Sequence, residues 1–123
     1  VGRMHQKYWG GKDCKLTVVE MKGWKREMSY ENTNLPWVLP SPNLATVEAA
    51  YTFVGTVLYE GTNISEGRGT TRSLEIIGHP KIEAFSFHDK LRPVLEKANL
   101  KGFVLRPLVF LPTFQKHKGE ACG

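Results

Sequence analysis

The chain has 123 residues, of which 41% are hydrophobic and 24% charged, as expected for one soluble globular domain or a segment of a longer protein. No apolar run approaches the roughly 18–20 residues that a membrane span requires, so we expect none. The net charge of +5 comes from scattered Lys and Arg without a block of like charge, which favours a mixed solvated surface and argues against a nucleic-acid partner.

The first third of the chain predicts one strand and one proline-rich loop. Val1–Lys12 is polar and lacks the hydrophobic region of a signal peptide. Lys15–Met21 is rich in β-branched residues and is typical of a short strand, with a turn at Gly23-Trp24. Glu31–Pro42 carries three prolines, each of which fixes φ and removes a backbone donor. We therefore expect an ordered, extended loop there.

The middle of the chain predicts a helix and a short buried strand. Asn43 is a suitable N-cap for a helix over Leu44–Val54. Apolar residues with helical spacing place one face toward the core, namely Val47, Ala50, Tyr51 and Val54. Gly55 ends this helix, and the apolar run Thr56–Tyr59 that follows is consistent with a strand.

The last third predicts a second helix and a second strand. Ser86 and Asp89 form a capping arrangement ahead of an apolar helical face. Because an interior proline costs on the order of 3 kcal/mol, we expect the regular helix to begin near Asp89, with Pro93 in its first turn. Phe103–Leu111 is strongly apolar and predicts a strand, which Pro107 places at an edge or a bulge.

The alternation of strands and helices favours an α/β fold with a small mixed sheet and two or more helices. Cys14 and Cys122 do not form a disulfide framework, and pairing between them and two free thiols both stay open. The four histidines lack the spacing of a zinc site, so we expect no metal. We also expect no cofactor.

The glycine-rich polar loop Glu60–Thr71 (EGTNISEGRGTT) is the stretch most typical of a ligand site. Its glycines allow close approach of a ligand, and the guanidinium of Arg68 matches a carboxylate or phosphate bidentately. The same composition also fits a surface turn whose polar groups satisfy one another. The loop lacks the Walker lysine and the third glycine of a dinucleotide motif. The predicted ligand-binding residues are Asn63, Arg68, Thr70, Thr71 and, near the C-terminus, Lys116.

Several carboxylates are candidates for glycosidic chemistry, which needs two carboxylates flanking the scissile bond and a raised pKa on the acid. The candidates are Glu60, Glu66, Glu75 and Glu120. For each, the alternative is a surface or ion-paired carboxylate, with Arg68 or Arg72 as possible partners. Sequence spacing alone assigns none of them as catalytic.

Three segments, in this order, resemble the NamZ-like exo-β-N-acetylmuramidases. They are Trp37–Asn43 (WVLPSPN), Tyr59–Thr71 (YEGTNISEGRGTT) and Phe110–Gly123 (FLPTFQKHKGEACG). The resemblance covers residues 15–123 and leaves residues 1–14 as a poorly defined tail. Where the family usually shows Pro-Phe-Glu after the loop, this chain has Ser73-Leu74-Glu75, and Leu39 stands where the family tends to have a second proline. These changes affect packing more than polar chemistry.

The resemblance implies a fragment of an exo-acting glycoside hydrolase that releases N-acetylmuramic acid from peptidoglycan fragments during cell-wall recycling in bacteria. It implies a longer, two-domain protein, exported to the periplasm or outside the cell, whose N-terminal domain carries the catalytic glutamate and lies outside this chain. This segment would then supply substrate-binding residues of the cleft.

For single residues, the resemblance assigns Arg68 to the lactyl carboxylate of the sugar, and Asn63, Thr70 and Thr71 to hydroxyl or acetamido groups. The alternative is a non-catalytic module that binds an anionic glycan or phosphate through the same loop.

Overall fold

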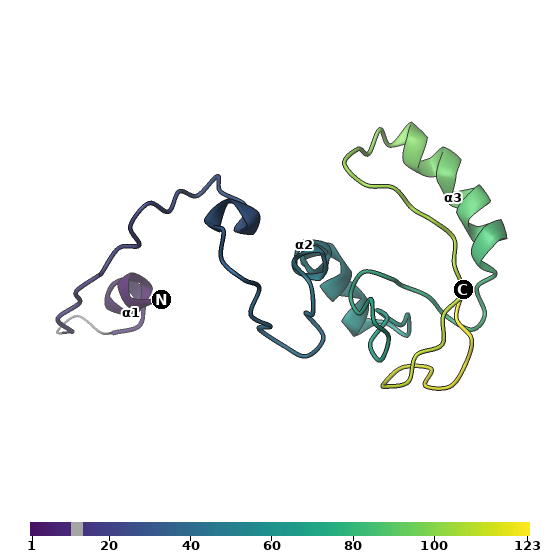
Figure 1. Cartoon of the computed structure of the whole chain (residues 1–123), viewed down its shortest axis with the longest axis horizontal. Helices are drawn as coiled ribbons and strands as arrows, with labels where there is room; N and C mark the ends of the chain where they lie inside the picture. Colours follow the sequence, from purple (N-terminus) through teal and green to yellow (C-terminus); the bar gives the residue numbers. More distant parts are fainter. Residues whose placement is uncertain (11–13) are drawn as a thin grey trace. The chain divides into compact units, whose positions relative to one another are not determined.

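The computed structural model describes residues 1–10 and 14–123, which form two compact units, Val1–Leu35 and Pro36–Gly123 (Figure 1). The first unit contains helix α1 (Gly2–Tyr8) and the 3₁₀ helix η1 (Tyr30–Thr33). The expected tail 1–14 includes residues 11–13, which lie outside the described residues, and α1 precedes them. In η1, the side chain of Asn32 accepts a hydrogen bond from the backbone N–H of Ser29 at 2.9 Å. This short helix lies at the start of the segment that we expected to be extended throughout.

The second unit contains two longer helices, and the segment that connects them includes the glycine-rich loop (Figure 1). Helix α2 spans Val47–Thr56 and continues directly as the 3₁₀ helix η2 (Val57–Gly61). Helix α3 spans Ala84–Lys97 and is followed by a long segment without regular structure that leads to the C-terminus. None of the described helices is long and apolar enough to cross a membrane.

The predicted α/β fold with a mixed sheet is wrong, because the described residues contain helices and no β-strand. Two isolated antiparallel bridges are present, between Ser65 and Gly78 and between Phe110 and Cys122. A β-branched, apolar segment becomes a strand only when another strand pairs with it. Within Lys15–Met21, Val19 is 90% exposed, and within Phe103–Leu111, Val104 is 93% exposed. Both segments thus have strand composition but form no strand, and these side chains remain exposed.

The predicted strand Thr56–Tyr59 is also wrong, since these residues complete α2 and form η2. Helix α2 itself starts three residues later than expected. Its N-cap is Thr46, whose hydroxyl accepts a hydrogen bond from the backbone N–H of Ala49 at 3.0 Å. Asn43 therefore does not cap it.

The buried side of α2 differs from the predicted one. Ala49 is buried, whereas Val54 is 79% exposed. The hydroxyls of Thr52 and Thr56 each donate to the carbonyl oxygen of Leu74 at 2.9 Å. The side of α2 that carries Thr52 and Thr56 therefore faces the backbone of Leu74. These polar contacts, and not the apolar periodicity, set the orientation of the helix.

Helix α3 begins five residues before the expected start. Glu83 is its N-cap, and its carboxylate accepts from the backbone N–H groups of Phe85 at 3.3 Å and Ser86 at 2.6 Å. Pro93 lies inside the helix and not in its first turn. The strong carboxylate cap is the local reason for the earlier start.

The core of the second unit is small and lies around Leu74. Four hydrophobic residues are buried among those described, namely Ala49, Leu74, Ala84 and Cys122. Leu74 is 1% exposed and has a φ of 68°, and its backbone N–H donates to the carbonyl oxygen of Glu66 at 2.7 Å. This bond ties the glycine-rich loop to the core. Both cysteine thiols are free, Cys14 exposed and Cys122 buried.

Candidate functional site

The loop Glu60–Thr71 is fixed against the C-terminal segment rather than standing free. Both the backbone N–H and the hydroxyl of Thr113 donate to the carbonyl oxygen of Gly69, at 3.1 and 2.7 Å. Gly69 has a φ of +80°, and a β-carbon there would collide with the backbone nitrogens of Thr113 and Phe114. Only glycine allows this close approach of the two segments.

A buried carboxylate, Glu66, organises the interior of the loop. Its side chain is 2% exposed. Its Oε1 accepts from Nε of Arg68 at 2.7 Å, and its Oε2 accepts from Nζ of Lys116 at 3.0 Å. The second guanidinium contact of Arg68 is to Glu60, through Nη2 and Oε1. The sequence-predicted residues Glu60, Glu66, Arg68 and Lys116 thus form one charge network.

Lys116 joins this network to the backbone of the loop. Its ammonium group also donates to the carbonyl oxygens of Tyr59 at 2.8 Å, Ile64 at 3.1 Å and Glu60 at 3.2 Å. An ammonium has three protons, so these four acceptors fully engage it. The contacts of Lys116 therefore hold the start of the loop around one cation.

The charge network lowers the pKa of Glu66. Burial raises it, but hydrogen bonds from Lys116, from the backbone and from Arg68 together outweigh burial, so the pKa of Glu66 lies below its ordinary value. Glu66 is therefore an ionised, structural carboxylate at neutral pH. A general acid of a glycosidase needs the opposite shift.

The other two candidate carboxylates lie elsewhere. Glu75 pairs with Arg72 at 2.5 Å and accepts from the hydroxyl of Thr46 at 3.1 Å. Glu120 is 62% exposed, and its carboxylate lies 3.7 Å from Nδ1 of His117. The structure thus brings Glu60 and Glu66 together on Arg68. Glu75 and Glu120 form ion pairs with other residues.

The predicted polar residues of the loop have different surroundings. The hydroxyl of Thr70 donates to the carbonyl oxygen of Gly67 at 2.6 Å and accepts from the backbone N–H of Arg72 at 3.2 Å, which closes a turn. Thr71 and Asn63 are exposed. A ligand-binding role for these residues stays a prediction.

Two histidines near Asn63, His79 and His117, were considered in the sequence only as possible zinc ligands and were not predicted to belong to the site. His117 Nε2 lies 2.7 Å from the carbonyl oxygen of Asn63, and His79 Nε2 lies 3.4 Å from the side-chain nitrogen of Asn63. The sequence could have indicated His117, because it directly follows the predicted binding residue Lys116 within the motif Phe110–Gly123. Nothing comparable indicated His79, beside Pro80.

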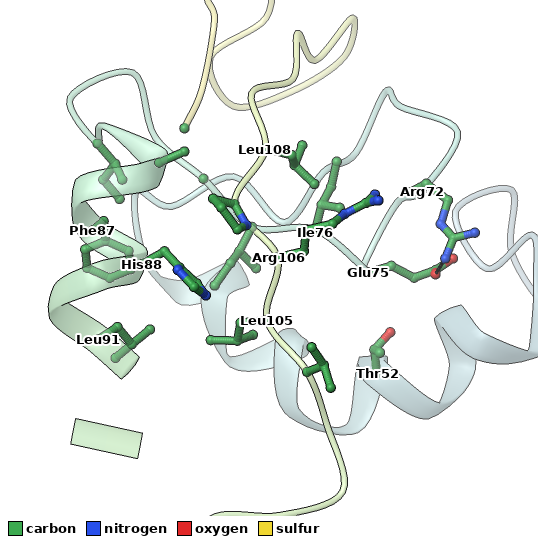
Figure 2. A pocket seen from close by; sticks show the side chains of 17 residues that line it. Thr52, Arg72, Glu75, Ile76, Phe87, His88, Leu91, Leu105, Arg106 and Leu108 are labelled. Atoms are coloured by element: carbon green, nitrogen blue, oxygen red, sulfur yellow. Dashed lines mark ion pairs between the residues drawn. The ribbon is translucent and has the colours of Figure 1, made fainter. Parts of the chain in front are cut away.

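An open groove of about 710 Å³ lies between α3 and the segment 104–108. Phe87, His88 and Leu91 line it from α3, while Leu105 and Leu108 line it from the extended segment (Figure 2). The ion pair of Arg72 and Glu75 lies at the side of the groove away from α3, near Thr52 of α2 (Figure 2). The groove is largely apolar, unlike the loop.

Comparison with known proteins gives two adjacent family matches. Residues 1–48 match the profile described as "Exo-beta-N-acetylmuramidase NamZ, N-terminal", and residues 51–123 match the profile described as "Exo-beta-N-acetylmuramidase NamZ, C-terminal". The chain therefore contains parts of both regions and the junction between them.

Two relatives are similar over most of the chain. The peptidoglycan beta-N-acetylmuramidase NamZ of Bacillus subtilis (strain 168) is 50% identical over 110 residues, which cover 89% of this chain and 26% of that protein. The crystal structure of a DUF1343 family protein from Bacteroides fragilis NCTC 9343 is 34% identical, with a TM-score of 0.74, over 89% of this chain and 28% of the other. The chain thus spans about a quarter of the length of these relatives.

Proposed function

Because this chain belongs to the exo-β-N-acetylmuramidase NamZ family, we propose that it supplies part of the sugar-binding cleft of a peptidoglycan hydrolase. The complete protein would release N-acetylmuramic acid from the ends of peptidoglycan fragments. Since such substrates arise outside the cytoplasm, the proposal includes export to the periplasm or the outside of the cell. The substrate, the activity and this location all belong to the proposal.

The observation that carries the proposal is the extent of the similarity to the muramidase. An alignment of 110 residues within a chain of 123 begins no later than residue 14 and ends no earlier than residue 110. It therefore contains the whole loop Glu60–Thr71. Together with the fixed geometry of that loop, this supports a role for it in recognition of the relative's class of substrate.

Arg68 is the residue that we assign to the lactyl carboxylate of the sugar. Its Nε is held by buried Glu66, whereas its Nη2 contacts Glu60, whose side chain is 40% exposed. An incoming carboxylate can displace the exposed Glu60 without disturbing Glu66. Glu60 then acts as an internal substitute for the ligand carboxylate, and it keeps the guanidinium oriented while the site is empty.

The catalytic carboxylate, in this proposal, comes from the N-terminal region beyond the part in this chain. Glu66 is unsuitable as a general acid, because its pKa is lowered by the cations that contact it. The alternative of a phosphate-binding module has weaker support. The matching family profiles and the Bacillus subtilis relative are described as muramidases, and none of these descriptions names phosphate.

The proposal is tested by the binding of N-acetylmuramic acid and of N-acetylglucosamine to this chain, measured by saturation-transfer NMR. We expect tighter binding of N-acetylmuramic acid. Arg68→Ala should remove this preference, at a cost of about tenfold in affinity for the acidic sugar, because one charge-assisted hydrogen bond is lost. The matched control is Arg72→Ala, since Arg72 is 62% exposed and pairs with Glu75 outside the network.

A second variant tests the displacement of Glu60. Glu60→Gln removes the competing internal charge, so it should strengthen the binding of N-acetylmuramic acid and leave that of N-acetylglucosamine unchanged. Equal effects of Arg68→Ala on both sugars would contradict the assignment of Arg68. Preferential binding of inorganic phosphate would favour the alternative module.

A further inference from the structure

Two histidines contact Asn63 at the surface of the loop, His79 at its side chain and His117 at its backbone carbonyl oxygen. The carbonyl oxygen of Asn63 lies 2.7 Å from Nε2 of His117. Because a carbonyl oxygen only accepts, this nitrogen of His117 carries a proton and donates it. The backbone position of Asn63 is thereby fixed.

The tautomer of His79 follows from its other nitrogen. Nδ1 of His79 lies 3.0 Å from the backbone nitrogen of Lys81. A backbone N–H only donates, so Nδ1 accepts this bond and the ring proton resides on Nε2. His79 therefore presents a donor to Asn63.

This donor sets the orientation of the Asn63 amide. The two amide ends are nearly identical in shape, and their assignment follows from the hydrogen-bond network. Nδ2 and Nε2 lie 3.4 Å apart, and two donors do not bond. A half-turn about χ2 places Oδ1 of Asn63 opposite the donor of His79, and Nδ2 with its two protons then faces solvent.

Further contacts hold the segments that carry these histidines. The two rings meet edge to face, with centroids 4.4 Å apart and an interplanar angle of 74°. The backbone N–H of His79 donates to Gly123 at 3.0 Å, and its carbonyl oxygen accepts from the N–H of Gly123 at 3.3 Å. Beside it, Gly78 forms the bridge to Ser65 at the centre of the loop. Within the described residues, no group of three metal-ligating side chains is present, so we assign no metal to the pair.

We propose that His79 is a positioning residue that presents the Asn63 amide protons to an acceptor oxygen of the ligand, the carbonyl of an N-acetylated sugar. His117 fixes the backbone of the same residue. This inference rests on the proposed function, since it specifies which group of the sugar the loop recognises. Arg68 would select the acidic substituent of the sugar, and Asn63 its acetamido group.

Two variants of His79 separate its two hydrogen bonds. In His79→Asn, the amide lies near the position of Nδ1, so it preserves the acceptor for Lys81 and removes the donor to Asn63. In His79→Gln, the amide reaches the position of Nε2 and restores that donor. The probes are N-acetylmuramic acid and muramic acid, in which a free amine replaces the acetamido group, and the comparison is between variants so that the charge of this amine is common to both.

We expect the unmodified chain to prefer N-acetylmuramic acid and His79→Asn to lose about five- to tenfold of that preference, the effect of one hydrogen bond. His79→Gln should retain most of it. Equal preferences in the two variants would overturn the recognition role, because a merely structural role of His79 predicts no rescue by Gln.

The tautomer is tested without any ligand, by two-bond ¹H–¹⁵N NMR correlations of the histidine rings. A proton on Nε2 of His79 supports the inference, and a proton on Nδ1 overturns it. This measurement distinguishes two failures. If the chain binds neither sugar, the proposed function and the recognition role both fall, whereas the orientation of Asn63 by His79 stands or falls with the tautomer alone.

Discussion

The carboxylate of Glu66 is buried and forms ion pairs with Arg68 and Lys116. Its removal should therefore be costly, because Arg68 and Lys116 would remain at the site without their shared counter-charge. We expect Glu66→Gln to lower the free energy of unfolding by about 2–4 kcal/mol, measured by urea denaturation. Glu120→Gln is the control, since that side chain is 62% exposed and its loss should cost less than about 0.5 kcal/mol.

The same residue makes the stability depend on pH in a defined direction. The pKa of Glu66 is lower in the folded chain than in the unfolded one, so its stabilising contribution is complete above the ordinary glutamate range. It is lost as the pH falls through the folded-state value. The unmodified chain should therefore lose stability with acid more steeply than Glu66→Gln. Parallel stability curves of the two proteins between neutral and acidic pH would contradict this role.

Single residues were predictable from the sequence as candidates, but their environments were not. The loop composition identified Arg68 and Glu66, and an ion-paired carboxylate was one of the two alternatives for each glutamate. The burial of Glu66 depends on Lys116, which lies 50 positions later in the chain. Sequence spacing carries no information about such a contact, and the roles that we propose for Asn63 and His79 depend on contacts of the same kind.

At the scale of elements, two residues were possible N-caps of α2, Asn43 and Thr46, and the structure uses Thr46. Thr46 accepts from Ala49, whereas Asn43 makes a contact of 3.4 Å with the hydroxyl of Ser73. We expect Thr46→Ala to destabilise the chain by about 1 kcal/mol, as measured by thermal unfolding in circular dichroism. Thr46→Ser keeps the hydroxyl and should lose much less, and Asn43→Ala should leave α2 intact. Greater helix loss in Asn43→Ala than in Thr46→Ala would show that the helix begins at the earlier cap.

The two main helices were predictable in existence and type, although their bounds and buried sides were not. Apolar periodicity identified both, but the hydroxyls of Thr52 and Thr56 orient α2 through Leu74. The prediction of strands was wrong for a different reason. Phe103–Leu111 has strand composition, but a strand also needs a pairing partner, and propensity does not report whether one is present. For this segment, the described residues provide the single bridge at Phe110.

For the whole molecule, apolar side chains are exposed and the buried core is small. Phe85, Leu58 and Val104 are 60%, 77% and 93% exposed. The part of this chain that matches the two relatives covers 26% and 28% of their lengths. The small core around Leu74 is joined to the loop and to α2 by hydrogen bonds, from the backbone N–H of Leu74 to Glu66 and from the hydroxyls of Thr52 and Thr56 to the carbonyl oxygen of Leu74.

The boundary of the compact units gives a final prediction. The units separate after Leu35, whereas the N-terminal family match extends to residue 48. Residues 36–48 therefore match the N-terminal region but belong structurally to the second unit. Within this segment, the indole N–H of Trp37 donates to the carbonyl oxygen of Leu44 at 3.1 Å. One contact of the segment with the rest of the unit is the cap of α2, in which the hydroxyl of Thr46 accepts from the backbone N–H of Ala49.

We expect a chain of residues 36–123 to retain the folded loop, because every contact described for Glu66, Arg68 and Lys116 joins residues of that unit. A chain of residues 49–123 lacks the cap of α2. It should lose that helix and, with it, the hydrogen bond from the hydroxyl of Thr52 to the carbonyl oxygen of Leu74. Hydrogen exchange at the amides of Ser65, Leu74 and Thr113 distinguishes the two chains. Protection should match that of the 123-residue chain in the first and decrease in the second, and equal protection in both would place the structural boundary at the family junction instead.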